Sequence, residues 1–256
     1  MSSQPAAAAE TLCLFAPPYD QLLPCSPEVV HELTDVDDWK GHALVWQLTA
    51  QSQQMGHFEM LRRKAPGLPL LVLLPPPADI RSVLDLLPLV KLLAPRVMLP
   101  YGLLDTPYRL RQVLAMPPRS LAAAVTEYLV RRGLLRTRKG IREFQRIMEL
   151  APDTSSIAML SRRMYTSRRT LGRHFIATGM PVPSHCLHFA RLINVASHLQ
   201  RDDVAVFRVA ARFGYPDGFT LSNQMKRLVG YRPSEVRDLL GWEWIVEAWL
   251  RQEGIV

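Results

Sequence analysis

Two stretches in the second half of the chain decide the fold that the sequence predicts: SIAMLSRRMYTSRRTLGRHFIATG at 156–179 and VFRVAARFGYPDGFTLSNQMKRLVG at 206–230. Each stretch predicts an apolar helix, a short turn and a second helix. In the second helix of the first stretch, Leu171 and Phe175 share one face, because residues four apart are neighbours on a helix. The opposite face is polar. This pattern is typical of helix-turn-helix units, in which one helix braces another that enters a DNA major groove.

The second stretch repeats the first at a fixed distance. Leu221 and Met225 stand 50 residues after Leu171 and Phe175. The interval leaves room for one long helix at about 185–200. A rigid helix of that kind would hold two groove-entering helices about 34 Å apart, which is one turn of DNA.

The net charge is concentrated around these stretches. The 256-residue chain has 31 Lys and Arg against 23 Asp and Glu, a net charge of +8. Residues 1–130 carry 10 basic and 12 acidic side chains, whereas 131–256 carry 21 and 11. The basic second half indicates a polyanionic partner, although solubility alone also requires net charge.

Composition excludes several other classes of protein. A hydrophobic content of 48% excludes a wholly disordered chain. Cys13, Cys25 and Cys186 form no CxxC pair, which argues against a disulfide framework and a zinc finger. His185 and His188 are three residues apart, but no third metal ligand is visible. We find no signal peptide, no apolar run of about 20 residues and no P-loop, GxSxG or HExxH motif. We therefore expect a cytoplasmic protein that is no enzyme, with no cofactor, no metal and no membrane contact.

The first half predicts an α/β domain. Short apolar runs at 11–15, 43–49, 69–74 and 96–100 have the length of strands buried on both faces, which predicts a parallel sheet. Helices are expected between and after them at about 27–39, 52–64, 78–93 and 105–116.

The second half predicts helices alone, after a helix at 120–132 and a basic link, RRGLLRTRK, at 131–139. We therefore divide the chain into a disordered start (1–9), an α/β regulatory or dimerisation domain (10–118), a helical linker (119–139) and an all-helical domain (140–256). Helices are expected at 141–150, 155–163, 167–178, 184–200, 204–213, 217–229 and 233–250. The apolar face of 242–250 is expected to pack in the core, with a dimer or polymerase contact as the alternative.

Residues of about 138–240 resemble the DNA-binding domain of the AraC/XylS family of bacterial transcription regulators. The resemblance rests on AARFGYPDGFTLSNQMKRLVGYRPSEVR at 210–237 and on SRRTLGRHF at 167–175. The chain departs from the family in having Leu221 and Met225 at positions that are usually aromatic, and Asn223 where Arg is frequent. These departures preserve the fold and change the expected base preference.

The resemblance implies two sets of DNA contacts. Arg presents a fork that fits guanine, Asn can pair with adenine, and Phe can pack on a thymine methyl group. The implied base-reading residues are Arg169, Gly172, Arg173, Gly218, Phe219, Ser222 and Asn223. Cations around them would hold phosphates without specifying sequence: Arg162, Arg163, Arg168, Lys226, Arg227 and Arg232. The alternative for any single Arg is a solvated helix face.

The stretch PRVMLPYGLLDTPYRLRQVL at 95–114 resembles the end of a response-regulator receiver domain of the flavodoxin-like type. Receiver chemistry needs an acidic pocket, an acceptor Asp and a Lys, but Leu99 stands at the Lys position. No acceptor Asp follows the strand at 43–49, and Ala16-Pro17-Pro18 replaces the acidic pair. The resemblance implies a degenerate receiver-like domain that is not controlled by phosphorylation; an unrelated small α/β domain that senses a ligand is the alternative.

Together these observations predict a sequence-specific DNA-binding regulator of transcription in the bacterial cytoplasm, associated with the nucleoid. Its expected partners are double-stranded DNA, a second copy bound through the N-terminal domain, and RNA polymerase or another regulator. Two alternatives stay open. Gly172 and Gly218 leave gaps on the polar faces, as in a protein-interaction scaffold that has lost DNA binding. An enzyme tethered to DNA would need reactive residues at the strand ends, where Pro and apolar residues predominate.

Overall fold

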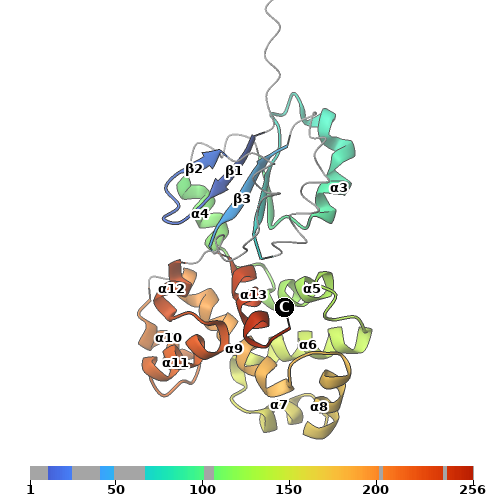
Figure 1. The fold of residues 1–256 in the computed structure, drawn as a ribbon, viewed down its shortest axis with the longest axis vertical. Coiled ribbons are helices and arrows are strands. Elements are labelled where there is room, and N and C mark those ends of the chain that lie inside the picture. The colour runs from blue at the N-terminus through green and yellow to red at the C-terminus, as the bar shows by residue number, and fades with distance from the viewer. Residues whose placement is uncertain are drawn as a thin grey trace, which may run out of the picture. The chain divides into compact units, whose positions relative to one another are not determined.

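The computed structural model describes residues 11–24, 41–48, 67–100, 107–201, 204–238 and 241–255. The chain divides into a unit that ends at Val113 and a unit that begins at Leu114 (Figure 1). The predicted disordered start and the helices predicted at 27–39 and 52–64 lie outside the described residues.

The first unit contains a mixed five-stranded sheet in the order β2-β1-β3-β4-β5. The apolar strands β3 and β4 are almost wholly buried, as expected for the centre of a sheet. Strands β3, β4 and β5 are parallel, whereas β1 is antiparallel to both β2 and β3. The strands are β1 (Thr11–Phe15), β2 (Leu22–Pro24), β3 (Ala43–Gln47), β4 (Leu70–Leu73) and β5 (Val97–Leu99).

The prediction of an all-parallel sheet is therefore wrong for β1. Phe15 at the end of β1 lies opposite Ala43 at the start of β3, so the chain enters β3 beside the point where β1 ends. A parallel pair would need a crossover that returns the chain to the other edge. Strand β2, which the sequence analysis did not predict, folds back on β1 and pairs Leu22 with Phe15.

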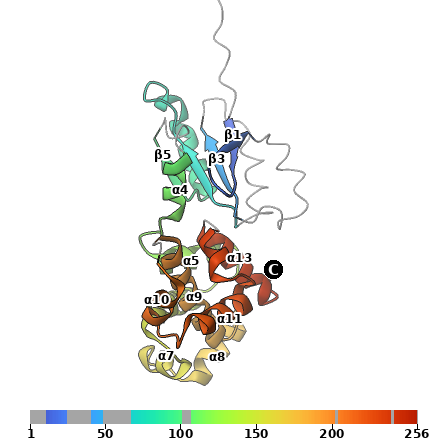
Figure 2. The ribbon, with the colours of Figure 1, turned by 90° about the vertical axis from the view of Figure 1, so that its left-hand side faces the viewer.

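The helix predicted at 78–93 is divided into a 3-10 helix, η2 (Ile80–Leu86), and an α-helix, α3 (Leu87–Leu92). Pro88 lies in the first turn of α3, where its missing N–H costs nothing. One continuous α-helix would place this proline in its interior. Val83 and Val90 are fully buried. The helix predicted at 105–116 is α4 (Pro107–Ala115), and Figure 2 shows it beside the sheet.

The second unit is helical, and its helices lie within a few residues of the predicted bounds up to residue 229. None of the helices in the described part of the chain is long and apolar enough to cross a membrane. The elements are α5 (Leu121–Arg131), α6 (Arg138–Leu150), η3 (Ala151–Asp153), α7 (Ile157–Arg163), α8 (Arg168–Ala177), α9 (Pro183–Arg201), α10 (Val206–Arg212), α11 (Gly218–Val229), α12 (Pro233–Asp238) and α13 (Trp242–Gln252).

The single helix predicted at 233–250 is wrong, because α12 ends at Asp238 and α13 begins at Trp242. Gly241 between them has a φ of 112°, a backbone conformation that glycine alone adopts readily. Every residue from Trp242 to Leu250 is buried, and the Trp249 ring stacks on Phe189 of α9 with 3.9 Å between centroids. This agrees with the core role expected for this helix.

Helix α5 and the segment after it are anchored in the second unit rather than free to act as a linker. Tyr128 donates its hydroxyl to Glu247 of α13 at 2.5 Å. Arg132 donates to both carboxylate oxygens of Glu247, at 2.9 and 3.1 Å. Because Glu247 is buried and Leu135 also packs in the core, the basic segment at 131–139 is held against the second unit through Arg132 and Leu135, while most of its other residues are exposed.

Candidate nucleic-acid interface

The second unit contains two helix pairs whose turns begin in the same way, although the second turn has one residue more before its capping residue. We call α7 and α8 the first helix pair, and α10 and α11 the second. Tyr165 and Gly214 stand at the same place in the two turns, with φ values of 51° and 68°. The next residue donates its N–H back to the first helix in both cases, Thr166 to Ser161 at 3.1 Å and Tyr215 to Ala210 at 2.9 Å. The two pairs therefore share a local geometry as well as a sequence pattern.

Each turn ends on a residue that caps the following helix. Ser167 Oγ accepts the backbone N–H of Thr170 at 3.0 Å, and Asp217 Oδ1 accepts that of Thr220 at 2.6 Å. These caps satisfy backbone N–H groups that the first turn of a helix leaves without partners. The Thr220 backbone N–H, followed by its hydroxyl, lowers the pKa of Asp217. Both α8 and α11 thus begin at a fixed point.

The face of each capped helix that points into the core is the predicted one. Leu171 and Leu221 are fully buried, and so are Met225 and, almost completely, Phe175. The burial pattern over 171–177 is identical to that over 221–227. Residues at the same helical phase therefore face solvent in α8 and α11.

The predicted base-reading residues lie on the exposed side of these two helices. Arg169 and Arg173 on α8 and Asn223 on α11 are exposed, while Gly172 and Ser222 are partly buried. Phe219 is 75% exposed, although it is a large apolar side chain. The structure thus brings Arg169, Gly172 and Arg173 together on one helix, and Gly218, Phe219, Ser222 and Asn223 on the other.

Gly172 and Gly218 differ in the space around the position where a Cβ would lie. A Cβ on Gly218 would point toward α10 and lie 3.6 Å from the backbone Cα of Phe207, an ordinary van der Waals distance, so packing does not require a glycine there. A Cβ on Gly172 would have no neighbour within 4 Å, so packing does not require a glycine there. Gly172 leaves an open place on the exposed face of α8.

The predicted phosphate-contacting residues surround both helices. Five are exposed: Arg162, Arg168, Lys226, Arg227 and Arg232. Arg163 differs, because it is partly buried and donates to Thr154 Oγ1 at 3.1 Å. The structure therefore gives Arg163 a role in holding the segment before α7.

Arg191 positions the second helix pair, and the sequence analysis missed it. This residue of α9 is only 8% exposed, and its Nη2 donates to the Phe213 carbonyl at 2.5 Å. Its guanidinium lies 4.9 Å from the centroid of the Tyr215 ring. Helix α9, which runs between the two pairs in Figures 1 and 2, thereby fixes the second turn. The available signal was a charged residue within an apolar helix.

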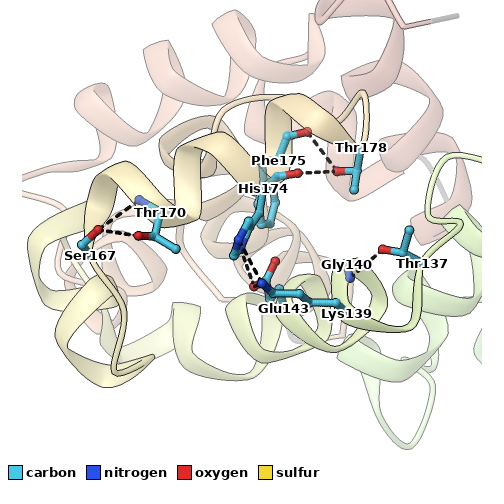
Figure 3. Close-up of polar contacts among 9 residues, drawn as sticks. All are labelled: Thr137, Lys139, Gly140, Glu143, Ser167, Thr170, His174, Phe175 and Thr178. Carbon is cyan, nitrogen blue, oxygen red and sulfur yellow. Dashed lines mark hydrogen bonds and ion pairs between the residues drawn. The ribbon is translucent and has the colours of Figure 1, made fainter.

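A second contact that the sequence did not reveal holds α8 against α6 (Figure 3). His174 Nδ1 lies 3.0 Å from Glu143 Oε1, and His174 Nε2 lies 2.9 Å from Lys139 Nζ. Because an ammonium group only donates, Nε2 accepts and Nδ1 carries the proton that the carboxylate accepts. This chain of contacts fixes the flank of α8 next to Arg173.

The region around His185 and His188 has no arrangement for a metal. The Cys186 thiol is buried and donates to the Pro181 carbonyl at 3.3 Å, and burial raises its pKa well above the usual range. His185 Nδ1 lies 2.9 Å from Glu253 Oε2. Burial, then the Arg227 and Arg191 charges, lower the pKa of His188. Within the described ranges, no group of three His, Cys, Asp or Glu residues is placed to hold a metal ion.

The first unit has a small open pocket where β4 and β5 end. Its volume is about 340 Å³, and Leu74, Pro75, Pro77, Ile80 and Pro100 line it. None of these side chains is an acid, a base or a nucleophile. Leu99, at the position where receiver domains carry Lys, is buried. Asp35, Asp37 and Asp38, which the sequence suggests as a solvated helix end, lie outside the described residues.

Comparison with known proteins supports the assignment of the second unit. Residues 160–238 match a family model described as "Helix-turn-helix domain", which confirms the predicted domain type in this part of the chain. No curated protein matches the chain. The solved structure of the xylose-binding transcription activator XylR is similar over 74% of this chain, at 15% sequence identity and a TM-score of 0.38. The chain spans 59% of the length of that structure.

Proposed function

We propose that this protein is a sequence-specific DNA-binding regulator of transcription that inserts α8 and α11 into adjacent major grooves. The observation that carries this proposal is the structure that the two helix pairs share, which we call the frame: the start of the turn, the capping residue and the buried leucine. Both pairs share the start of the turn, a side-chain cap and the buried Leu, and both expose the same helical face within a helix-turn-helix domain. In DNA-binding units of this kind, the capped helix enters the groove and its first turns contact base edges.

The connecting helix α9 supports simultaneous insertion. It has 19 residues and is therefore about 28 Å long at 1.5 Å per residue. One turn of DNA spans about 34 Å, so a helix of this length suits two reading helices in successive grooves. The contact of Arg191 with the Phe213 carbonyl fixes one end of this arrangement.

The exposed faces predict different base contacts for the two helices. Arg169 and Arg173 present guanidinium forks that fit O6 and N7 of guanine. Asn223 suits adenine, and the exposed ring of Phe219 suits a thymine methyl group. Gly172, with nothing within 4 Å of its Cβ position, would let the backbone of α8 approach the bases, whereas the Cβ position of Gly218 faces α10. The surrounding cations, Arg162, Arg168, Lys226, Arg227 and Arg232, would supply salt-dependent affinity for phosphates.

We further propose that the first unit, with a boundary near residue 118, regulates or dimerises the DNA-binding unit without phosphorylation. Leu99 and the residues after β1 and β3 (Ala16 and Leu48) give no acidic pocket and no Lys for receiver chemistry. The mixed sheet also departs from the all-parallel sheet expected for a receiver-like domain. In this account the protein is a homodimer in the bacterial cytoplasm, bound to the nucleoid, and contacts RNA polymerase or another regulator. It needs no cofactor and catalyses no reaction.

A salt titration of DNA binding tests this function. We expect the full chain to bind mixed-sequence duplex DNA at about 50 mM salt, with an affinity that falls steeply as salt increases. Binding that is absent even at this low salt would contradict the proposal. That result would favour the second candidate, a protein-interaction scaffold, for which the open place at Gly172 is the supporting observation.

A further inference from the structure

The N-terminal turns of α6 carry a cationic surface that the two helix pairs do not explain. Arg138, Lys139 and Arg142 lie on one face of α6 and are all exposed. We call these three residues the α6 cluster. Positions 138 and 142 are neighbours on a helix, and 139 lies beside them.

Of the three, Lys139 contacts His174 and Glu143, whereas Arg138 and Arg142 add no stabilising ion pair to the described part of the fold. The N-terminus of a helix carries a partial positive charge, so cations in its first turn are unfavourable. Like charges at i and i+4 add a further cost. The first turn of α6 contains no acidic residue, and Arg138 and Arg142 form no ion pair in the part of the chain that the structure describes. By contrast, Arg146 on the same helix pairs with Glu149 at 3.2 Å.

One member of the α6 cluster touches the groove-entering helix directly. Lys139 Nζ lies 2.9 Å from His174 Nε2, and His174 follows Arg173 on α8 (Figure 3). His174 is in turn held by Glu143 of α6 at 3.0 Å. Successive residues on a helix are about 100° apart. The α6 cluster therefore flanks the exposed face of α8 instead of lying behind it.

We propose that the α6 cluster contacts the DNA phosphate backbone beside the groove that α8 enters. This inference rests on the proposed function and adds a third element to the interface. The phosphates lie along both edges of the major groove, which is about 12 Å wide, so a flank of α8 faces one edge. An exposed cationic surface in which Arg138 and Arg142 have no ion pair within the described residues suits this partner, because Lys and Arg release counterions when they meet phosphates.

The second helix pair has no equivalent surface. Gln224 on α11 stands 50 residues after His174, at the same helical position, and carries no charge. Helix α11 packs against α13, and Gln252 at the end of α13 lies beside Gly230 at the end of α11. The interface is therefore asymmetric, with additional backbone contacts on the α8 side.

The test compares two triple variants of the full chain. One is Arg138→Gln, Lys139→Gln and Arg142→Gln; the matched control is Arg81→Gln, Arg109→Gln and Arg111→Gln, which removes three exposed arginines from the first unit. The probes are a duplex recovered from random sequences by the unaltered chain and an unrelated duplex of the same length. Affinity is measured from 50 to 300 mM salt, with thermal unfolding beside it.

We expect the α6 variant to lose affinity for both duplexes, on the order of tenfold or more at 100 mM salt. The slope of log affinity against log salt should fall by about 0.9 for each phosphate contact removed, while the preferred sequence stays the same. Removal of the Arg138 and Arg142 charges should not lower the unfolding temperature, because both cations lie near the positive end of the helix dipole and neither has an ion pair in the described residues. The double variant Arg138→Gln, Arg142→Gln keeps the Lys139–His174 contact. Its slope should change by about two thirds as much as that of the triple variant.

Three results would overturn the inference. A slope equal to that of the control variant, with the unaltered chain still binding, would refute the α6 contact and leave the proposed function intact. A loss of affinity for the selected duplex alone would mean that the cluster reads sequence and does not hold phosphates. If the unaltered chain bound neither duplex, the proposed function and this inference would fail together.

Discussion

The first and second helix pairs share their buried frame and differ in what they expose. In both, a leucine and a bulky apolar residue are buried, and a Ser or Asp caps the helix. The exposed face of α8 carries Arg169 and Arg173, whereas that of α11 carries no cation among its predicted base-reading residues. The comparison teaches that the frame and the exposed surface vary independently. It also predicts that the first pair contacts bases through charged side chains and the second pair through uncharged ones.

The largest expected effect tests whether the frame is shared. Leu171→Ala and Leu221→Ala each remove a fully buried side chain at the equivalent position. Each should lower the free energy of unfolding by about 2–5 kcal/mol, measured by denaturant titration. The control Ile176→Ala, at a side chain that is 69% exposed, should change it by less than about 0.5 kcal/mol. If one leucine variant were as mild as the control, the two frames would not be equivalent.

The exposed faces differ most in their expected base preferences. Arg173→Ala should relax the preferred base at one position of the site and cost about 1–3 kcal/mol there, and Asn223→Ala should do so at a different position. Arg227→Ala, which removes an exposed cation, should weaken binding evenly over all sequences and lower the salt slope by about 1. Selection of bound sequences with each variant measures these effects. An even loss of affinity from Arg173→Ala would make this residue a phosphate contact.

The two turns differ in backbone strain. Tyr165 has a positive φ and is 97% exposed, whereas the equivalent residue of the second turn is Gly214. A left-handed backbone conformation destabilises the folded state by about 1–2 kcal/mol at a residue with a Cβ. Replacement by glycine removes this strain, but it also raises the conformational entropy of the unfolded chain, which offsets part of the gain in stability. Tyr165→Gly should therefore raise the free energy of unfolding by about 0.5–1 kcal/mol, and Gly214→Ala should lower it by about 1 kcal/mol. Denaturant titration checks both signs, and a stability loss from Tyr165→Gly would contradict the argument.

The smallest expected effect is a pH dependence beside the second pair. Burial and nearby cations lower the pKa of His188 in the folded protein. In the unfolded chain the pKa of His188 is near 6.5. Between this value and the lower pKa of the folded protein, the unfolded state binds more protons, so the free energy of unfolding falls as the pH drops. We expect His188→Gln to lose less stability between pH 7.5 and 5.5 than the unaltered chain, as measured by thermal unfolding. An equal or larger acid loss in the variant would show that His188 does not contribute.

Local signals predicted most of the helical unit. The spacing of Leu171 and Phe175 depends on neighbours within one helical turn, and α8 and α11 lie within one residue of the bounds expected for them. Ser167 and Asp217, which were expected as the first residues of these helices, are their capping residues. The break at Gly241 was missed because a glycine in an apolar segment does not reveal its φ. The direction of β1 was also missed, because strand pairing depends on residues far apart in the sequence.

The supporting contacts of the candidate interface were not predictable for the same reason. Arg191 and Phe213 are 22 residues apart, and His174 and Glu143 are 31 apart. No helical periodicity relates such residues, and each pair meets only after the helices have packed. Arg169, Arg173 and Asn223 could be proposed because the resemblance to the AraC/XylS family implies base-reading residues at these positions, and the structure shows all three exposed.

The most direct test of the central account is the selection of bound duplexes from random DNA with the full chain. The account predicts two short preferred blocks whose centres are about 10–10.5 base pairs apart, so that α8 and α11 enter successive major grooves on one side of the duplex. The block that Arg173→Ala relaxes should differ from the one that Asn223→Ala relaxes. A single block, or two blocks half a turn apart, would contradict paired insertion of the two helices.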